Sequence, residues 1–141
     1  MKYIVTINGK HGNFPIKGLN ELLGGRIYDR RTKKYRNAVK SANDLVCRKA
    51  IRACLKGVKL NTPIKCTYHL YAKNRLHDRS NLYSSCEKSF LDALQQERSI
   101  TNDGWSDVYD SEFHTYLDPI NPRIIIEIEE ITDADSQERK G

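Results

Sequence analysis

A strict alternation of apolar and polar side chains over residues 64–73 is the feature that most constrains the fold of this chain. The apolar positions are Ile64, Cys66, Tyr68, Leu70 and Ala72, and the polar positions between them are Lys65, Thr67, His69, Tyr71 and Lys73. Because successive side chains of a strand point to opposite faces, this pattern predicts a strand with one buried face and a firm register. The chain must therefore build a sheet whose apolar side is covered.

Three further segments, residues 3–7, 107–117 and 123–131, have strand-like patterns, and the last of these is expected to be a sheet edge or a half-buried strand. Apolar residues at three- and four-residue steps predict a helix over residues 35–56, with Gly57 ending it. Its predicted buried stripe is Tyr35, Val39, Ala42, Val46, Ala50 and Ala53. Its charged residues Lys40, Arg48 and Arg52 are expected either to be solvated or to contact a nucleic-acid backbone.

A second helix is predicted from residue 81 to about residue 97, with Ser80 or Asn81 as its N-cap. One side gathers Leu82, Cys86, Phe90, Ala93 and Leu94, and the other gathers Asn81, Ser85, Lys88 and Asp92. The expected fold class is α+β, with a small mixed sheet of about four strands and two principal helices. We expect one domain over residues 1–131 and a polar, frayed tail over residues 132–141.

Composition indicates a globular chain rather than a disordered one, because 38% of its 141 residues are hydrophobic. No apolar run approaches the ~20 residues of a membrane helix, and the apolar start is too short for a signal peptide, so we expect no membrane partner and a cytoplasmic location, host or bacterial and associated with the nucleoid. The four cysteines lack zinc-site spacing and are expected to be reduced thiols in the core: Cys47, Cys54, Cys66 and Cys86.

Positive charge is concentrated in the first part of the chain. Residues 1–80 hold 19 Lys and Arg against 4 Asp and Glu, a net charge of +15, whereas residues 81–141 hold 5 against 14, a net charge of −9. Such a regional excess attracts a polyanion, or it serves only to keep the protein soluble. Residues 8–34 read as a long basic loop that DNA would order. The expected DNA contacts are Arg30, Arg31, Lys33, Lys34, Lys73, Arg75, Arg79 and Asn81.

A set of carboxylates and one ammonium group suits phosphodiester cleavage assisted by Mg²⁺, with Mn²⁺ as a possible substitute. Asp78 precedes the second helix, Asp92 lies on its polar row, and Asp103 follows in the next turn. Hard oxygen ligands of this kind hold Mg²⁺, so all three are candidate metal ligands and catalytic residues. Lys88 shares a helix face with Asp92 and is either a catalytic cation or one half of a surface ion pair. We expect no small-molecule cofactor.

The same residues resemble the signature of the RusA-type Holliday-junction resolvases, particularly their phage-borne branch. That signature is D-x-D-N, then a Lys within a helix, then D-A-L, then an Asp-containing turn. The matching stretches here are Asp78-Arg79-Ser80-Asn81, Lys88, Asp92-Ala93-Leu94 and Ile100-Thr101-Asn102-Asp103-Gly104-Trp105. Weaker similarity at residues 18–21, 35–39 and 121–124 extends the resemblance over roughly residues 3–131.

The resemblance implies a Mg²⁺-dependent, homodimeric endodeoxyribonuclease that resolves four-way DNA junctions by paired symmetric nicks during recombination and repair. A two-fold dimer suits a junction that is itself approximately two-fold symmetric. By this resemblance, Asp78 and Asp103 bind metal, Lys88 is catalytic, and Asp92 belongs to the same site. One departure is important: Ser80 replaces the second aspartate of the signature. A hydroxyl is a weaker ligand than a carboxylate, so this change is expected to weaken metal binding, unless Asp92 or Asp107 compensates.

Three other interpretations stay open at this point. The first is a junction-binding protein that kept the fold and the basic surface but cleaves poorly or not at all. The second is a dimeric scaffold with no role on nucleic acid. The third is an HD-type phosphohydrolase, suggested by His77-Asp78, although that fold needs further histidines at helical spacing, which His11, His69 and His114 do not provide.

Overall fold

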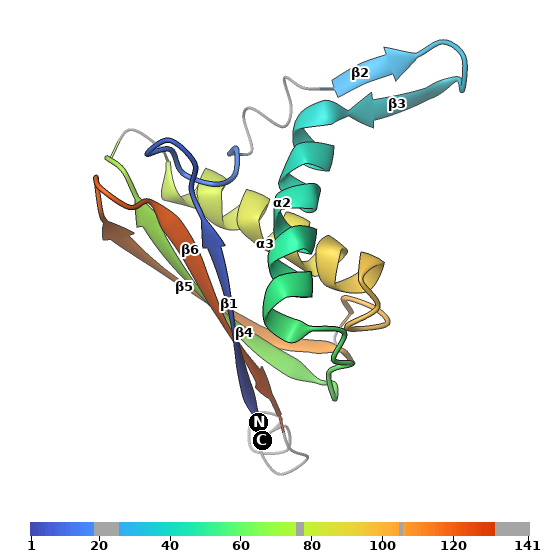
Figure 1. Cartoon of the computed structure of the whole chain (residues 1–141). Coiled ribbons are helices and arrows are strands. Elements are labelled where there is room, and N and C mark those ends of the chain that lie inside the picture. Colours follow the sequence, from blue (N-terminus) through green and yellow to red (C-terminus); the bar gives the residue numbers. More distant parts are fainter. Residues whose placement is uncertain (19–25, 76–77, 105, 132–141) are drawn as a thin grey trace.

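The computed structural model of the chain describes residues 1–18, 26–75, 78–104 and 106–131. A four-stranded sheet has the order β1-β6-β4-β5, and helices α2 and α3 both lie on one of its faces (Figure 1). A separate two-stranded hairpin, β2-β3, projects from the start of α2. The expected single small α+β domain with a mixed four-stranded sheet and two principal helices is confirmed. No helix among the described residues is long and apolar enough to cross a membrane.

The sheet is built from strands whose predicted positions hold closely. Its members are β1 (Lys2–Asn8), β4 (Ile64–Ala72), β5 (Val108–Leu117) and β6 (Arg123–Glu130). Strand β4 has the predicted alternation at every residue, from buried Ile64 to buried Ala72. It pairs antiparallel with β6 and parallel with β5, and α3 is the crossover between the two parallel strands. Strand β6 is an interior strand between β1 and β4 with one buried side, so the half-buried strand is confirmed and the alternative of a sheet edge is wrong.

The hydrophobic core lies between this sheet and the two helices. Tyr68 of β4 is fully buried, and its ring packs edge-on against Phe90 of α3 at 5.9 Å and stacks on Phe113 of β5 at 4.9 Å. Ile124, Ile126 and Ile128 of β6 are also fully buried. Each strand therefore contributes its apolar row to one layer.

Helix α2 (Ala38–Leu55) starts three residues later than predicted, because residues 34–37 form strand β3. Asn37 is the N-cap, and its side chain accepts a 3.0 Å hydrogen bond from the Lys40 amide. The predicted buried stripe is also wrong, since Ala42 and Ala53 are exposed and Val46 and Ala50 are only half-buried. The buried row lies one position further along the chain: Asn43, Cys47, Ile51 and Leu55.

Helix α3 (Arg79–Gln96) buries its predicted apolar side, Leu82, Cys86, Phe90, Ala93 and Leu94. The N-cap is Asp78 rather than Ser80 or Asn81, because the Asp78 carboxylate accepts hydrogen bonds from both of their amides, at 2.8 Å and 3.4 Å. Ser85 was expected on the exposed polar row but is fully buried against α2. Cys47, Cys66 and Cys86 are buried thiols as predicted, whereas Cys54 is exposed.

The basic loop expected over residues 8–34 contains part of an ordered hairpin. Strand β2 (Arg26–Asp29) pairs antiparallel with β3 (Lys34–Asn37), from Arg26 opposite Asn37 to Asp29 opposite Lys34. Residues 19–25 of that loop and the tail 132–141, which is predicted to be frayed, lie outside the described residues.

Glu97 links the two helices at their distal ends. Its carboxylate accepts hydrogen bonds from Arg52 Nε at 2.5 Å and Arg48 Nε at 2.7 Å, both from α2. Arg52 and then Arg48 lower the pKa of Glu97 to about 2. These arginines were expected to be solvated or to contact a nucleic-acid backbone, so the structure corrects that assignment for both.

A pH-dependent contribution to stability follows from this pair of contacts. The folded-state pKa of Glu97 lies below its ordinary value of 4.5, so its stabilising contribution is present above that value and is lost as the pH falls toward 2. We expect Glu97→Gln to lower the free energy of unfolding by about 1 kcal/mol at pH 7, since Arg52 is more than half exposed. Denaturant titrations at several pH values would show the two proteins converging near pH 2. A constant difference down to pH 2 would contradict it.

Candidate functional site

A cleft of about 860 Å³ lies where the parallel strands β4 and β5 end and helix α3 begins. Because β4 and β5 are parallel, their last residues, Ala72 and Leu117, lie opposite each other at the same edge of the sheet. The first turn of α3 forms the other wall of the cleft. The lining residues are Ala72, Asn74, Arg75, Asp78, Arg79, Ser80, Leu82, Thr115, Tyr116 and Leu117. Open α/β sheets bind ligands at this kind of position, outside the carboxyl ends of parallel strands.

The cleft is polar and carries more positive than negative charge. Arg75 and Arg79 are both exposed, and Asp78 is the one acidic residue among the lining residues. The Asp78 carboxylate is already engaged in capping α3 through its Oδ1 atom. The N-terminus of α3 adds a positive partial charge to this wall, although Asp78 already accepts from the Ser80 and Asn81 amides. Together with the two arginines it favours anions such as phosphate oxygens. Ser80, exposed in the first turn, adds a hydroxyl to the same wall.

The other predicted catalytic and metal-binding residues lie outside this cleft. Asp92 is 13 residues after Arg79 on the same helix, which places it roughly 20 Å along the helix axis. Asp103 is exposed beyond the far end of α3, next to Gly104, whose carbonyl accepts hydrogen bonds from the start of β5. Asp78 therefore lies near the ends of β4 and β5, whereas Asp103 lies near the start of β5, at the opposite end of these parallel strands.

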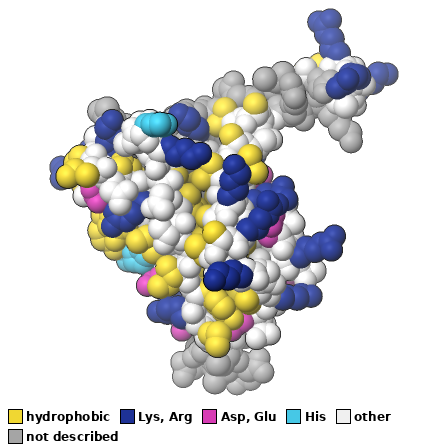
Figure 2. All heavy atoms as spheres, in the orientation of Figure 1, with side chains coloured by type: hydrophobic (Ala, Val, Ile, Leu, Met, Phe, Trp, Pro, Cys, Tyr) yellow, Lys and Arg dark blue, Asp and Glu magenta, His cyan; other side chains and the backbone are white. Residues whose placement is uncertain are grey.

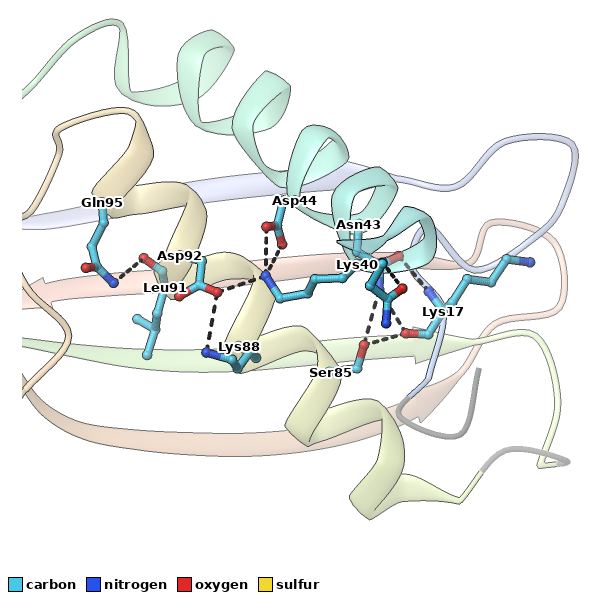
Figure 3. Close-up of polar contacts among 10 residues, drawn as sticks. Lys17, Lys40, Asn43, Asp44, Ser85, Lys88, Leu91, Asp92 and Gln95 are labelled. Atoms are coloured by element: carbon cyan, nitrogen blue, oxygen red, sulfur yellow. Dashed lines mark hydrogen bonds and ion pairs between the residues drawn. The ribbon is translucent and has the colours of Figure 1, made fainter. Parts of the chain in front are cut away.

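Asp92 takes part in a polar network between the two helices (Figure 3). Lys40 of α2 donates to Asp92 Oδ2 at 2.8 Å and to both carboxylate oxygens of Asp44, at 2.6 and 2.7 Å. The ammonium group of Lys88 lies 3.5 Å from Asp92, so the predicted i, i+4 ion pair is present. Burial would lower the pKa of Lys40, but the hydrogen bonds that Lys40 donates to Asp44 and Asp92 raise that pKa above its ordinary value. Lys40 is therefore a positively charged residue that bridges the Asp44 and Asp92 carboxylates. The expectation that it is solvated or contacts a nucleic-acid backbone is wrong.

A second set of contacts at this interface holds residues 17 and 18. Asn43, 2% exposed, accepts a hydrogen bond from the Lys17 amide at 3.0 Å and donates to the Lys17 carbonyl at 3.1 Å. Ser85 donates to the same carbonyl, and Gly18 lies against Asn81 and Leu82. Residues 17 and 18 are thereby anchored between the starts of α2 and α3. These contacts were not among the predictions from the sequence, although an Asn and a Ser at helical spacing from apolar residues are a signal for them.

No group of three or more His, Cys, Asp or Glu side chains within the described ranges is placed to hold a metal ion. Asp78, Asp92 and Asp103 are accordingly not brought together as one donor set. The cleft offers a single carboxylate and a serine hydroxyl, which suit Mg²⁺ only when substrate phosphates supply further oxygens. Asp107 is half-buried near Gly104, on the Asp103 side, and so does not complete the donor set at the cleft.

The predicted DNA contacts fall into two groups. Arg75, Arg79 and half-buried Asn81 lie at or beside the cleft, and exposed Lys73 directly follows β4. Arg30, Arg31 and Lys33 are exposed at the tip of the β2-β3 hairpin, and Lys34 is the first residue of β3. Figure 2 shows Lys and Arg side chains at the hairpin tip and across the visible face of the body.

Neither protein-family models nor curated protein sequences give a match to this chain.

Proposed function

We propose that this chain binds branched DNA and that the cleft at the ends of β4 and β5 receives the phosphate backbone. The observation that carries this proposal is the meeting of Arg75, Arg79 and the first turn of α3 around one hollow. Arginine forms paired hydrogen bonds with phosphate oxygens, and a helix N-terminus supplies partial positive charge. The net charge of +15 in residues 1–80 would attract DNA to the molecule as a whole.

The junction as the preferred substrate is suggested by the ordered signature shared with the RusA-type resolvases. A homodimer belongs to the same proposal, because two copies related by a two-fold axis present two clefts to the two sides of a four-way junction. Such a protein would work where DNA is found, in the cytoplasm of a bacterial cell or a phage host.

Mg²⁺-dependent cleavage of the bound junction is the second candidate function. Its support is the position of Asp78 and Ser80, the signature residues that share the cleft with the two arginines. Against cleavage stands the separation of Asp78 from Asp92 and Asp103, which leaves one carboxylate in the cleft. Binding without turnover is thus the function that the geometry favours, and resolution by paired nicks is the function that the sequence signature favours.

The binding proposal predicts a large effect of removing the two cleft arginines. We expect Arg75→Ala combined with Arg79→Ala to weaken binding of a synthetic four-way junction roughly 10- to 100-fold at about 0.1 M salt, because two phosphate contacts are lost. The slope of log affinity against log salt should fall by about two. Fluorescence anisotropy over a salt series measures both quantities.

A matched control is the Lys49→Ala, Lys59→Ala pair, which removes the same charge from exposed positions away from the cleft. This pair should change affinity and slope far less. If both double variants lost the same affinity for the junction, the cleft would not be a specific binding site, and the loss would reflect only the lower net charge of the protein. If the natural protein had no measurable affinity for the junction at low salt, the DNA-binding proposal would be wrong. The dimeric scaffold with no role on nucleic acid would then remain.

A further inference from the structure

The β2-β3 hairpin is a projecting arm with an unusually dense positive charge. Figure 1 shows it extending away from the sheet and both helices, attached at the start of α2. Residues 26–36 hold six Lys or Arg against one Asp, a net charge of +5 in eleven residues. Arg30, Arg31 and Lys33 are exposed in its turn, where Lys33 adopts a left-handed backbone conformation with φ of 55°. Figure 2 shows basic side chains at this tip, beyond the surface of the body.

The core of the domain does not explain this arm. Of the hairpin residues whose side chains the structure describes, 28, 30–33 and 37, none belongs to the buried core cluster, and outside the hairpin β2 contacts α2. A two-stranded hairpin by itself is marginally stable in water. Tyr28 on β2 is also 49% exposed, so an aromatic side chain accompanies the cations. These features fit a segment that contacts another molecule and does not stabilise the domain itself.

We propose that the hairpin is a β-ribbon arm that enters the major groove of one duplex of the branched DNA bound by the cleft. This inference rests on the proposed DNA-binding function. The major groove of B-DNA, about 12 Å wide, admits a two-stranded ribbon, whereas the minor groove is about half that width. Arginine is the side chain that most often reads groove edges, by paired contacts to guanine O6 and N7.

Charge complementarity selects DNA over a protein partner for this arm. A net charge of +5 matches a surface with closely spaced phosphates, and the arm itself has only Asp29 to offset it. The competing occupant is a second copy of this chain, whose residues 81–141 have a net charge of −9. The test below separates these two occupants.

The experiment compares the natural protein with a triple variant, Arg30→Gln, Arg31→Gln and Lys33→Gln, on a four-way junction with guanine-containing arms. We expect affinity to fall roughly 100- to 1,000-fold at about 0.1 M salt and the salt slope to fall by about three. Dimethyl sulfate modifies guanine N7 in the major groove and adenine N3 in the minor groove. Natural protein should protect a few guanine N7 positions and leave adenine N3 open, and that N7 protection should vanish in the variant at saturating protein.

The control triple variant, Lys10→Gln, Lys49→Gln and Lys59→Gln, removes the same charge from exposed positions outside the hairpin and should keep the N7 protection. If the natural protein binds the junction and the hairpin variant has the same affinity and the same salt slope, the proposal for the hairpin is wrong. The proposal for the cleft is not affected by that result. Weakened binding with unchanged N7 protection would also overturn it, because the arm would then contact only the backbone. A change from dimer to monomer in the hairpin variant, measured by sedimentation, would assign the arm to the second copy instead. Natural protein that binds no junction would remove the proposed function and the arm together.

Discussion

We expect the Ser80→Asp variant to nick a four-way junction in Mg²⁺ at least about a hundredfold faster than the natural sequence does. Ser80 is exposed in the first turn of α3 and lines the cleft with Asp78. An aspartate there adds the second carboxylate that the resolvase signature contains, and a first-turn acid is compatible with a helix N-terminus. Two carboxylates with substrate phosphates form a donor set that suits Mg²⁺. Nicking of a labelled junction on denaturing gels, with and without chelator, measures the rate.

The matched control is Ser84→Asp, which adds the same charge to an exposed position one turn further along α3 and outside the cleft lining. It should leave the nicking rate unchanged. If neither variant nor the natural protein cuts in Mg²⁺ or Mn²⁺ at low salt, cleavage is excluded and junction binding remains. If the natural protein already cuts at a rate that Ser80→Asp does not raise, the site assembles its ligands without position 80.

The largest loss of stability is expected from Phe90→Ala. The Phe90 side chain is fully buried, and its ring meets Tyr68 edge-on at 5.9 Å between α3 and the sheet. Truncation removes this contact and leaves a cavity that the sheet and helices cannot fill, so the free energy of unfolding should fall by about 3–5 kcal/mol. That is a large share of the ~5–15 kcal/mol typical of a whole domain. Urea denaturation followed by circular dichroism gives the difference.

Ile120→Ala is the control, because Ile120 is 89% exposed in the turn before β6. Its effect should stay within about 0.5 kcal/mol. A loss below about 1 kcal/mol for Phe90→Ala would mean that α3 does not pack on the sheet as described.

The sheet could be predicted from the sequence because its strands carry their own pattern. The alternation in β4 and the isoleucines of β6 specify which side of each strand is buried, whatever the neighbouring strand is. Strand order is a different kind of information, since it depends on contacts between residues far apart in the chain. The interior position of β6 was missed for this reason: Glu127 and Glu129 suggested an edge, yet they lie on the open face of an interior strand.

Helix α2 shows where a periodic pattern misleads. Alanines at 42, 50 and 53 satisfied the expected spacing, but alanine is nearly indifferent to burial, so the larger Ile51 and Leu55 set the buried side. Asn43 then joins that side because Lys17 and Ser85 satisfy its amide. Ser85 and Asp92 on the polar row of α3 likewise lie toward α2 because Asn43 and Lys40 form hydrogen bonds with them. The positions of the apolar residues alone do not predict these contacts.

The candidate site was predictable only in part. Asp78, Arg75 and Arg79 follow a strand and start a helix, so their shared position could be expected from local sequence. The ion pair of Asp92 with Lys40 could not be predicted from local sequence, because Lys40 lies 52 residues away in the chain, on another helix. Asp103 resembles Asp78 as an acid beside a helix end, but it lies at the opposite end of the same helix.

The place of β6 also governs when this protein can fold during its synthesis. Strand β1, which precedes the other described strands in the chain, pairs only with β6 among them, and β6 is separated from it by more than a hundred residues. A nascent chain that has reached residue 122 therefore holds an N-terminal strand with no hydrogen-bonding neighbour and a β4 edge still open. The ribosome must release the residues up to Glu130 before this domain closes. A chain cut short before β6 would leave two unpaired strand edges exposed to aggregation.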